Sequence, residues 1–284
     1  MDLIVQRVTG WVILWFTLYR TCKIVFNKKQ PEYNCRIVTL LHAICITLTS
    51  CYLTFFQGSN PYTVLGFPNT SAQVTCLTIS LGYFLYDFMW CLYYQTEGPV
   101  MIMHHIVSIT FMAVCLYLGV SGTETVATIF GSEVTSIFLN IRWFLKSHEM
   151  YNNAIVGYTV DFIFVLLFLI VRIGVGGTLM YSVWASDRPP SMVKAGGTMF
   201  YFINCIFLVQ IISFSRYRLK NWSNSSAMKN GINQPNSTNM LKHIGTAENI
   251  SINGHKLNGA AKLLHQDHVL LKPCVFDNTK LLTK

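Results

Sequence analysis

The sequence contains few charged residues. Only 12% of its 284 residues are charged, whereas 52% are hydrophobic. Soluble domains usually carry about 25% charged residues, and a soluble core of this length has no room for so much apolar surface. The deficit excludes an ordinary soluble globular protein and makes lipid the expected solvent for most of the chain.

Several motifs that mark common functions are absent from the sequence. None of the nine cysteines forms a CxxC pair and most lie inside apolar runs, so neither a zinc site nor a disulfide framework is expected. There is no Walker-type phosphate loop and no GxSxG nucleophile elbow. The net charge of +9 is not gathered into a basic stripe with interleaved aromatic residues, so nucleic acid is not an expected partner. No cofactor is expected either.

Long apolar runs are what the sequence does contain. A helix needs about 20 mostly apolar residues to cross hydrocarbon. Seven segments meet this requirement: 3–26, 37–56, 74–94, 101–119, 123–141, 155–184 and 196–214. The fifth is the most polar, and the sixth is long enough to tilt or to end in an interfacial turn. The predicted fold class is all-α, a multi-pass transmembrane bundle of about seven spans with a disordered C-terminal tail.

Composition divides the chain into three parts. Residues 1–34 supply the first span and a basic loop, and residues 35–216 form the main transmembrane domain. Residues 217–284 are rich in Asn, Ser, Thr and Lys and lack sustained apolar periodicity. Such a segment buries too little apolar surface to offset its ordering entropy, so a disordered cytosolic tail is expected.

Loop charges predict the orientation in the membrane. Segments 27–36 and 216–220 are basic, whereas 57–73 contains no Lys or Arg; only the basic residues in 185–195 disagree with the pattern. The positive-inside rule places the N-terminus in the lumen or outside the cell, and the C-terminus in the cytosol. Asn69 begins an Asn-Thr-Ser sequon in a loop expected outside, which makes it a candidate glycosylation site. The endoplasmic reticulum or the plasma membrane is the expected location.

Ionisable residues occur inside the predicted spans, where each costs at least about 2.5–3.5 kcal/mol at the bilayer centre on insertion scales. They are His42, Asp87, His104, His105, Glu133, Asp161 and Arg172. The predicted topology places Glu133 near mid-membrane. It places four others at a similar depth, within roughly 5–10 Å of the cytosolic boundary, where they could converge: Asp87, His104, His105 and Asp161. Two interpretations are open, namely buried partners that hold the bundle together, or the polar lining of a functional cavity.

A more specific signal comes from the pattern Gly-Tyr-x-x-x-Asp at residues 82–87, followed by Glu97-Gly98 and the pair His104-His105. This combination resembles the TLC domain, a family that includes ceramide synthases and translocating-chain-associating membrane proteins. The resemblance covers about residues 35–216. It implies a six-helix core plus one further helix, arranged around a lipid-sized cavity.

The resemblance also implies candidate catalytic residues. In ceramide synthases the paired histidines serve acyl transfer from acyl-CoA to a sphingoid base, and they match His104 and His105. A second signature of those enzymes matches residues 132–140, but here Ser132 replaces a His and Ser136 an Asp. Serine is no base near neutral pH, so synthase chemistry is in doubt while the lipid cavity is expected to persist.

Three functions follow as alternatives. The first is a lipid-binding TLC-domain protein that influences membrane lipid composition, with membrane lipids, including sphingolipids or acyl chains, as its partners. The second is an acyl-CoA-dependent acyltransferase of the ceramide-synthase type. The third is a receptor or transporter, which rests only on the number of spans, and span number alone carries little functional information.

Overall fold

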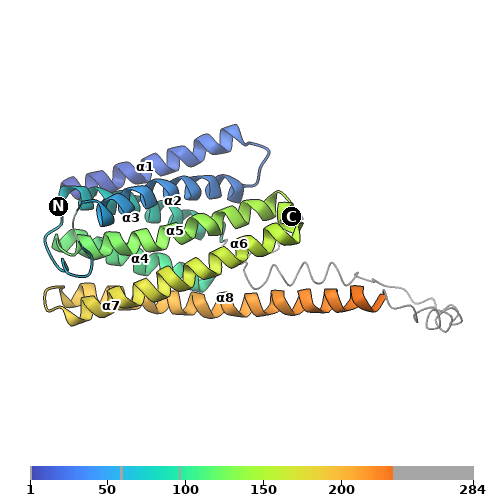
Figure 1. Ribbon diagram of the computed structural model, residues 1–284. Helices are drawn as coiled ribbons and strands as arrows, with labels where there is room; N and C mark the ends of the chain where they lie inside the picture. The colour runs from blue at the N-terminus through green and yellow to red at the C-terminus, as the bar shows by residue number, and fades with distance from the viewer. Residues whose placement is uncertain (1, 58–59, 96, 233–284) are drawn as a thin grey trace, which may run out of the picture. The chain divides into compact units, whose positions relative to one another are not determined.

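The computed structural model describes residues 2–57, 60–95 and 97–232. All regular elements in this part of the chain are helical, apart from an isolated β-bridge between Pro68 and Val120 (Figure 1). The elements are α1 (Asp2–Val25), α2 (Pro31–Phe55), α3 (Ser71–Tyr94), α4 (Pro99–Leu118), α5 (Gly122–Ser147), a 3₁₀ turn (Met150–Asn152), α6 (Ala154–Leu167), a π-helical segment (Phe168–Val175), α7 (Gly176–Ala185) and α8 (Ser191–Ile232). The predicted all-α class is confirmed.

The seven predicted spans coincide with helices. Within the described residues, five segments are long and apolar enough to cross a membrane: Pro31–Phe55, Ser71–Tyr94, Pro99–Leu118, Ile155–Ala185 and Ser191–Arg216. The helices α1 and α5 have 24 and 26 residues, but their composition is more polar. The chain is therefore a multi-pass membrane protein, and the segment predicted to be the most polar span is one of the two helices outside this set.

Local signals explain where α3 and α4 begin and end. Thr70 and Gln73 form a capping box, in which the Thr70 hydroxyl accepts from the Gln73 amide at 3.2 Å and Gln73 Oε1 accepts from the Thr70 amide at 2.9 Å. Pro99 occupies the first turn of α4, where its missing N–H costs no hydrogen bond. The helix ends at Gly119, whose φ of 69° suits a residue without a side chain.

The helices pack side by side, with α2 along α5 and α1 along α3, while α3 also contacts α4. The closest approach is at Gly82 of α3, where a Cβ atom would lie 2.5 Å from Cβ of Trp11 on α1. Small residues allow such contact between membrane helices. An aromatic cluster that includes Trp15, Tyr83 and Trp90 fills the space beside it.

The predicted sixth span contains a π-helical segment between α6 and α7. Sequence reasoning expected a tilt or an interfacial turn in 155–184, but the structure contains a wider helical turn that holds Arg172. Wider turns of this kind are rare and frequently mark functional sites.

The helix α8 is longer than predicted. It runs to Ile232, so residues 217–232, which composition assigned to the disordered tail, are helical. Once a helix is nucleated, each further residue adds a hydrogen bond, and residues 198–230 contain neither Gly nor Pro. The chain divides within α8 into two compact units, after Leu208, and all sites described below lie in the first. The rest of the predicted tail, 233–284, lies outside the described residues.

Candidate functional site

Asp87 of α3 and His105 of α4 are in contact, as their predicted depth suggested. Oδ2 of Asp87 lies 3.6 Å from Nε2 of His105, and the two side chains are 15% and 5% exposed. Cys91, one turn further along α3, places its Sγ 3.9 Å from the same nitrogen.

Cys35 of α2 lies on the other side of Asp87. Its thiol donates a hydrogen bond to Oδ1 of Asp87 at 3.5 Å, and the Tyr86 hydroxyl donates to the Cys35 sulfur at 3.7 Å. Sequence reasoning treated the cysteines as small buried hydrophobic residues and therefore missed Cys35 and Cys91. The available signal was the spacing of Asp87 and Cys91, which puts both on one helical face.

His104 points away from this group. Its ring packs against Phe200 and Phe207 of α8, at centroid distances of 5.6 and 5.7 Å. Its Nδ1 atom is buried and has no hydrogen-bond partner among the described residues. Adjacent residues project about 100° apart on a helix, so His105 alone faces Asp87.

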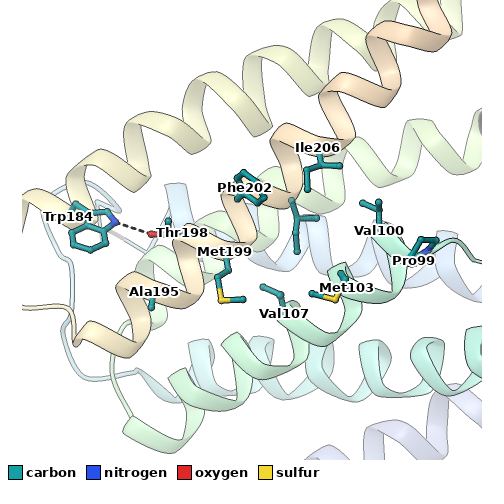
Figure 2. Close-up of a pocket in the computed structure, with 11 residues that line it drawn as sticks. Pro99, Val100, Met103, Val107, Trp184, Ala195, Thr198, Met199, Phe202 and Ile206 are labelled. Carbon is teal, nitrogen blue, oxygen red and sulfur yellow. Dashed lines mark hydrogen bonds between the residues drawn. The ribbon is translucent and has the colours of Figure 1, made fainter.

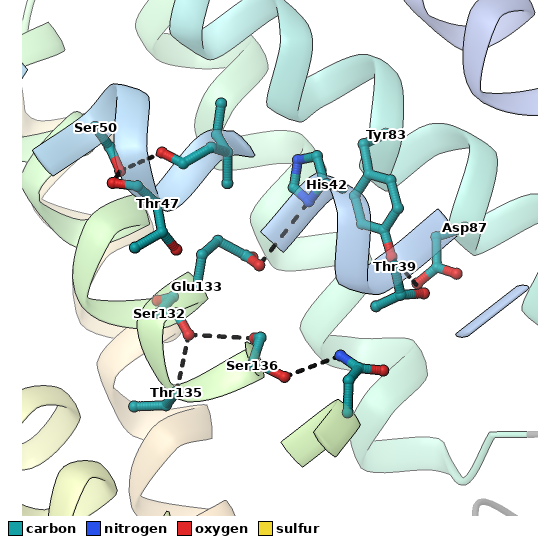
Figure 3. Close-up of polar contacts among 12 residues, drawn as sticks. Thr39, His42, Thr47, Ser50, Tyr83, Asp87, Ser132, Glu133, Thr135 and Ser136 are labelled. Carbon is teal, nitrogen blue, oxygen red and sulfur yellow. Dashed lines mark hydrogen bonds and ion pairs between the residues drawn. The ribbon is translucent and has the colours of Figure 1, made fainter. Parts of the chain in front are cut away.

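Glu133 of α5 meets His42 of α2 and not the histidine pair (Figure 3). Oε2 of Glu133 lies 3.9 Å from Nδ1 of His42, whose ring stacks on Tyr83 at a centroid distance of 3.7 Å. The Tyr83 hydroxyl donates to Thr39 at 3.0 Å. In this view, Tyr83 lies between His42 and Asp87.

Arg172, in the π-helical segment, is bonded to the stretch that corresponds to the second synthase signature. Its guanidinium donates to Thr135 Oγ1 and to the Ser132 carbonyl, each at 2.7 Å, and to Ser136 Oγ at 3.3 Å. It also donates to Oδ1 of Asn204 on α8 at 3.1 Å. Of the residues that differ from the synthase pattern, Ser136 supplies a side-chain acceptor for this cation, whereas Ser132 contributes only its backbone carbonyl.

Asp161 of α6 contacts Arg142 of α5 and Tyr151 of the 3₁₀ turn. Its Oδ1 accepts from Nε of Arg142 at 2.6 Å and its Oδ2 accepts from the Tyr151 hydroxyl at 2.5 Å. Depth along the membrane was estimated from sequence, but the direction in which α6 presents Asp161 is set by its packing against α5.

Other residues singled out by the resemblance meet near the connection between α3 and α4. Arg36 of α2 pairs with Glu97 at 3.3 Å and with Glu32 at 3.5 Å. Burial raises the pKa of Glu97 from 4.5 to about 7, although Arg36 opposes the rise.

Asn69, the predicted glycosylation site, is half-buried. Its Nδ2 atom, to which an N-linked glycan would attach, donates to the Cys115 carbonyl at 3.0 Å. Transfer of a glycan would therefore have to precede folding of this loop, and glycosylation of Asn69 stays a prediction.

An apolar groove of about 720 Å³ runs between α4 and α8 (Figure 2). It is lined by Pro99, Val100, Met103, Val107, Trp184, Ala195, Thr198, Met199, Phe202, Ile203 and Ile206. Along α8 the lining extends from Ala195 to Ile206, which corresponds to about 16 Å at 1.5 Å per residue. A separate cavity of about 30 Å³ beside Glu133 has room for only one or two water molecules.

Comparison with known proteins identifies the family. The model of the TLC domain matches residues 32–218. TLC domain-containing protein 4 C of Dictyostelium discoideum is 30% identical over 160 residues, covering 53% of this chain and 55% of that protein. TLC domain-containing protein 4 of Homo sapiens is 28% identical over 167 residues, covering 56% and 62%. The chain thus spans little more than half the length of these relatives. Because the domain match covers more than half of the chain, the protein belongs to the TLC-domain family.

Proposed function

We propose that the protein binds a membrane lipid, seats an acyl chain in the groove between α4 and α8, and thereby influences membrane lipid composition. The observation that supports this proposal is the apolar groove of about 720 Å³. Its volume lies in the range of about 300–1,000 Å³ that is typical of small-molecule sites. Ten of its lining residues are apolar or aromatic, and Thr198 is the exception.

The dimensions of the groove suit one leaflet of a bilayer. Its length of about 16 Å along α8 is close to half of the roughly 30 Å hydrocarbon core. Both walls belong to helices that are long and apolar enough to cross a membrane, so a lipid tail can enter from the surrounding bilayer without passing through water. The Trp184 indole donates a hydrogen bond to Thr198 at 3.0 Å. An acyl chain in the groove would meet polar side-chain atoms at this pair.

The test is mass spectrometry of lipids that co-purify with the full-length protein in detergent. Val107→Trp and Ala195→Trp each place a large ring in the groove. Overfilling a packed site costs about 1–3 kcal/mol, which corresponds to roughly a fivefold to hundredfold loss of bound lipid. The matched control is Phe162→Trp on α6, since Phe162 is 67% exposed and does not line the groove.

Lipid retained equally by all three variants would contradict the proposal, as would a lipid profile identical to that of empty detergent micelles. Cells that overproduce the wild-type protein should also change in membrane lipid composition. The groove variants should lose that effect while the control keeps it.

An acyltransferase is the second candidate, and the contact between Asp87 and His105 favours it. The carboxylate would orient the imidazole through Nε2, leaving Nδ1 as the general base that accepts a proton from an attacking amine. Acyl transfer to that amine would release the thiolate of coenzyme A. The test is transfer from acyl-CoA to a sphingoid base, with activity lost in a folded His105→Gln variant. Wild-type protein without turnover would remove this candidate.

Two finer assignments belong to the same proposal. Asn34-Cys35-Arg36 and Arg172-Ile173-Gly174 also fit the TLC pattern, and within the family the chain resembles TLC domain-containing protein 5. The expected location is the endoplasmic reticulum or the plasma membrane. The loop charges favour an orientation with the N-terminus in the lumen or outside the cell.

A further inference from the structure

Three side chains of types that bind transition metals meet at the contact between α3 and α4. A carboxylate oxygen of Asp87, the Cys91 sulfur and an imidazole nitrogen of His105 all lie within 4.8 Å of one another. Cys91 and His105 are buried, at 3% and 4% exposed. We propose that these residues form a binding site for a divalent metal ion, with Zn²⁺ the ion that best suits this set of donors.

The separations are close to those that a bound ion requires. Zinc binds oxygen, nitrogen and sulfur at about 2.0–2.3 Å, which at tetrahedral angles puts the ligand atoms about 3.3–3.6 Å apart. The distance from Oδ2 of Asp87 to Nε2 of His105 is 3.6 Å, and Sγ of Cys91 is 3.9 Å from the same nitrogen. Changes of a few tenths of an ångström in side-chain position bring these two contacts to ligand geometry.

The spacing of Asp87 and Cys91 along α3 brings two of the three proposed ligands to the same place. Asp87 and Cys91 are four residues apart, so α3 presents both from one face. Metal-binding helices use the same spacing when two ligands come from a single helix. His105 completes the set from α4, which packs directly on α3. The ion would therefore bridge two helices through donors that the fold already holds in place.

Charge balance favours a divalent cation. Asp87 supplies one negative charge, and Cys91 supplies a second when the metal displaces its thiol proton. Together with neutral His105, they compensate an ion of charge +2. Electroneutrality matters here because an uncompensated charge buried away from water is strongly unfavourable.

Cys35 acts as an outer partner of the site. Its thiol bonds to Oδ1 of Asp87 at 3.5 Å, which leaves Oδ2 directed at His105. Hydrogen bonds of this kind orient carboxylate ligands. Three protein ligands leave one tetrahedral position for a further ligand, an arrangement found in zinc sites that do chemistry and not in closed structural sites.

The experiment uses full-length protein in detergent, titrated with Co²⁺ as a spectroscopic probe and then with Zn²⁺ in competition. We expect a thiolate-to-cobalt absorption band in the near ultraviolet at about one ion per chain, which Zn²⁺ abolishes. Cys91→Ala should eliminate the band, and Asp87→Asn should weaken binding at least about tenfold. Cys35→Ala should weaken it by about tenfold, as loss of an outer partner does.

Cys76→Ala is the matched control, because Cys76 is also a fully buried cysteine of α3 but lies outside the cluster. The histidines in residues 243–268 are further candidate ligands for Co²⁺, and the readout is therefore the thiolate band and not total metal content. Wild-type protein without the band would overturn the proposal, as would an equal loss in Cys76→Ala and Cys91→Ala. Lipid co-purification is measured independently, so failure of this site leaves the proposal for the groove intact.

Discussion

Arg172 illustrates how a single charged side chain is held inside an apolar run. Its guanidinium reaches a backbone carbonyl, two hydroxyls and an amide oxygen on α5 and α8. Hydrogen bonds to charged groups contribute about 1.5–3 kcal/mol each, which offsets the cost of placing the charge in the membrane. Ser136, which cannot serve as a base, thereby has a structural role as an acceptor for Arg172.

Replacing Arg172 should destabilise the protein. Arg172→Met keeps the volume but leaves several buried acceptors unpaired, and we expect a loss of about 3 kcal/mol or more. Arg172→Lys should recover only part of the lost free energy of unfolding, because an ammonium group lacks the planar fork that reaches the acceptors on α5 and α8 together. Thermal unfolding followed by tryptophan fluorescence measures the stability of both variants. Arg20→Met, at an exposed position of α1, is the control and should change little.

Glu97 should make stability depend on pH. Its pKa is raised from 4.5 to about 7 in the folded protein by burial. The stability that the protonated carboxyl contributes is therefore complete below about pH 4.5 and is lost as pH rises toward 7. The shift corresponds to up to about 3 kcal/mol. We expect the apparent Tm of the wild type to fall over this window relative to that of Glu97→Gln.

The same pH series on Glu149→Gln provides the control, because Glu149 is exposed. This variant should retain the wild-type pH dependence. An identical slope in Glu97→Gln and wild type would show that Glu97 is not the titrating group.

The helix α5 shows that a helix of low hydropathy can still pack against other helices of the bundle. It was the most polar of the predicted spans, and it packs along α2. Its polar residues face other helices, since Glu133 meets His42 and Thr135 accepts from Arg172. Polar residues in membrane helices typically face the bundle interior, so low hydropathy here reflects contacts with protein and not exposure to water.

The contact between α1 and α3 depends on Gly82. Gly82→Ala places a Cβ 2.5 Å from that of Trp11, so the two helices must separate. We expect a loss of about 1–3 kcal/mol, the usual cost of overpacking, measured as a lower apparent Tm. Gly10→Ala is the matched control, because a Cβ at Gly10 meets nothing within 4 Å, and alanine there should be neutral or stabilising. Equal effects at both positions would contradict a close helix contact at Gly82.

For the molecule as a whole, orientation in the membrane is the main open prediction. Basic residues in 27–36 and 216–220 place these segments in the cytosol. In sealed microsomes, we expect added protease to remove a C-terminal epitope and to spare an N-terminal one. An endoglycosidase-sensitive shift that disappears in Asn69→Gln would agree with this orientation. Protection of the C-terminal epitope would reverse the assignment.

Much of the fold was predictable because the hydropathy of a membrane-spanning segment depends only on the consecutive residues of that segment. The runs 37–56, 74–94 and 101–119 each fall within a single helix to within one residue. Capping signals such as Thr70 and Gly119 act within a few residues and are equally readable. The end of α8 was not predictable from composition, because continuation of a helix through polar residues depends on the stable helix before them.

The sequence by itself determined a multi-pass helical membrane protein of the TLC type. The tertiary structure alone decided the partners. In the folded chain, Cys35 and Cys91 lie beside Asp87, Glu133 lies beside His42, and Asp161 bonds to Arg142. The groove between α4 and α8 also exists only through packing. The physical reason is that periodicity gives the face and depth of a side chain on its own helix, whereas its neighbours depend on how separate helices rotate and pack against one another.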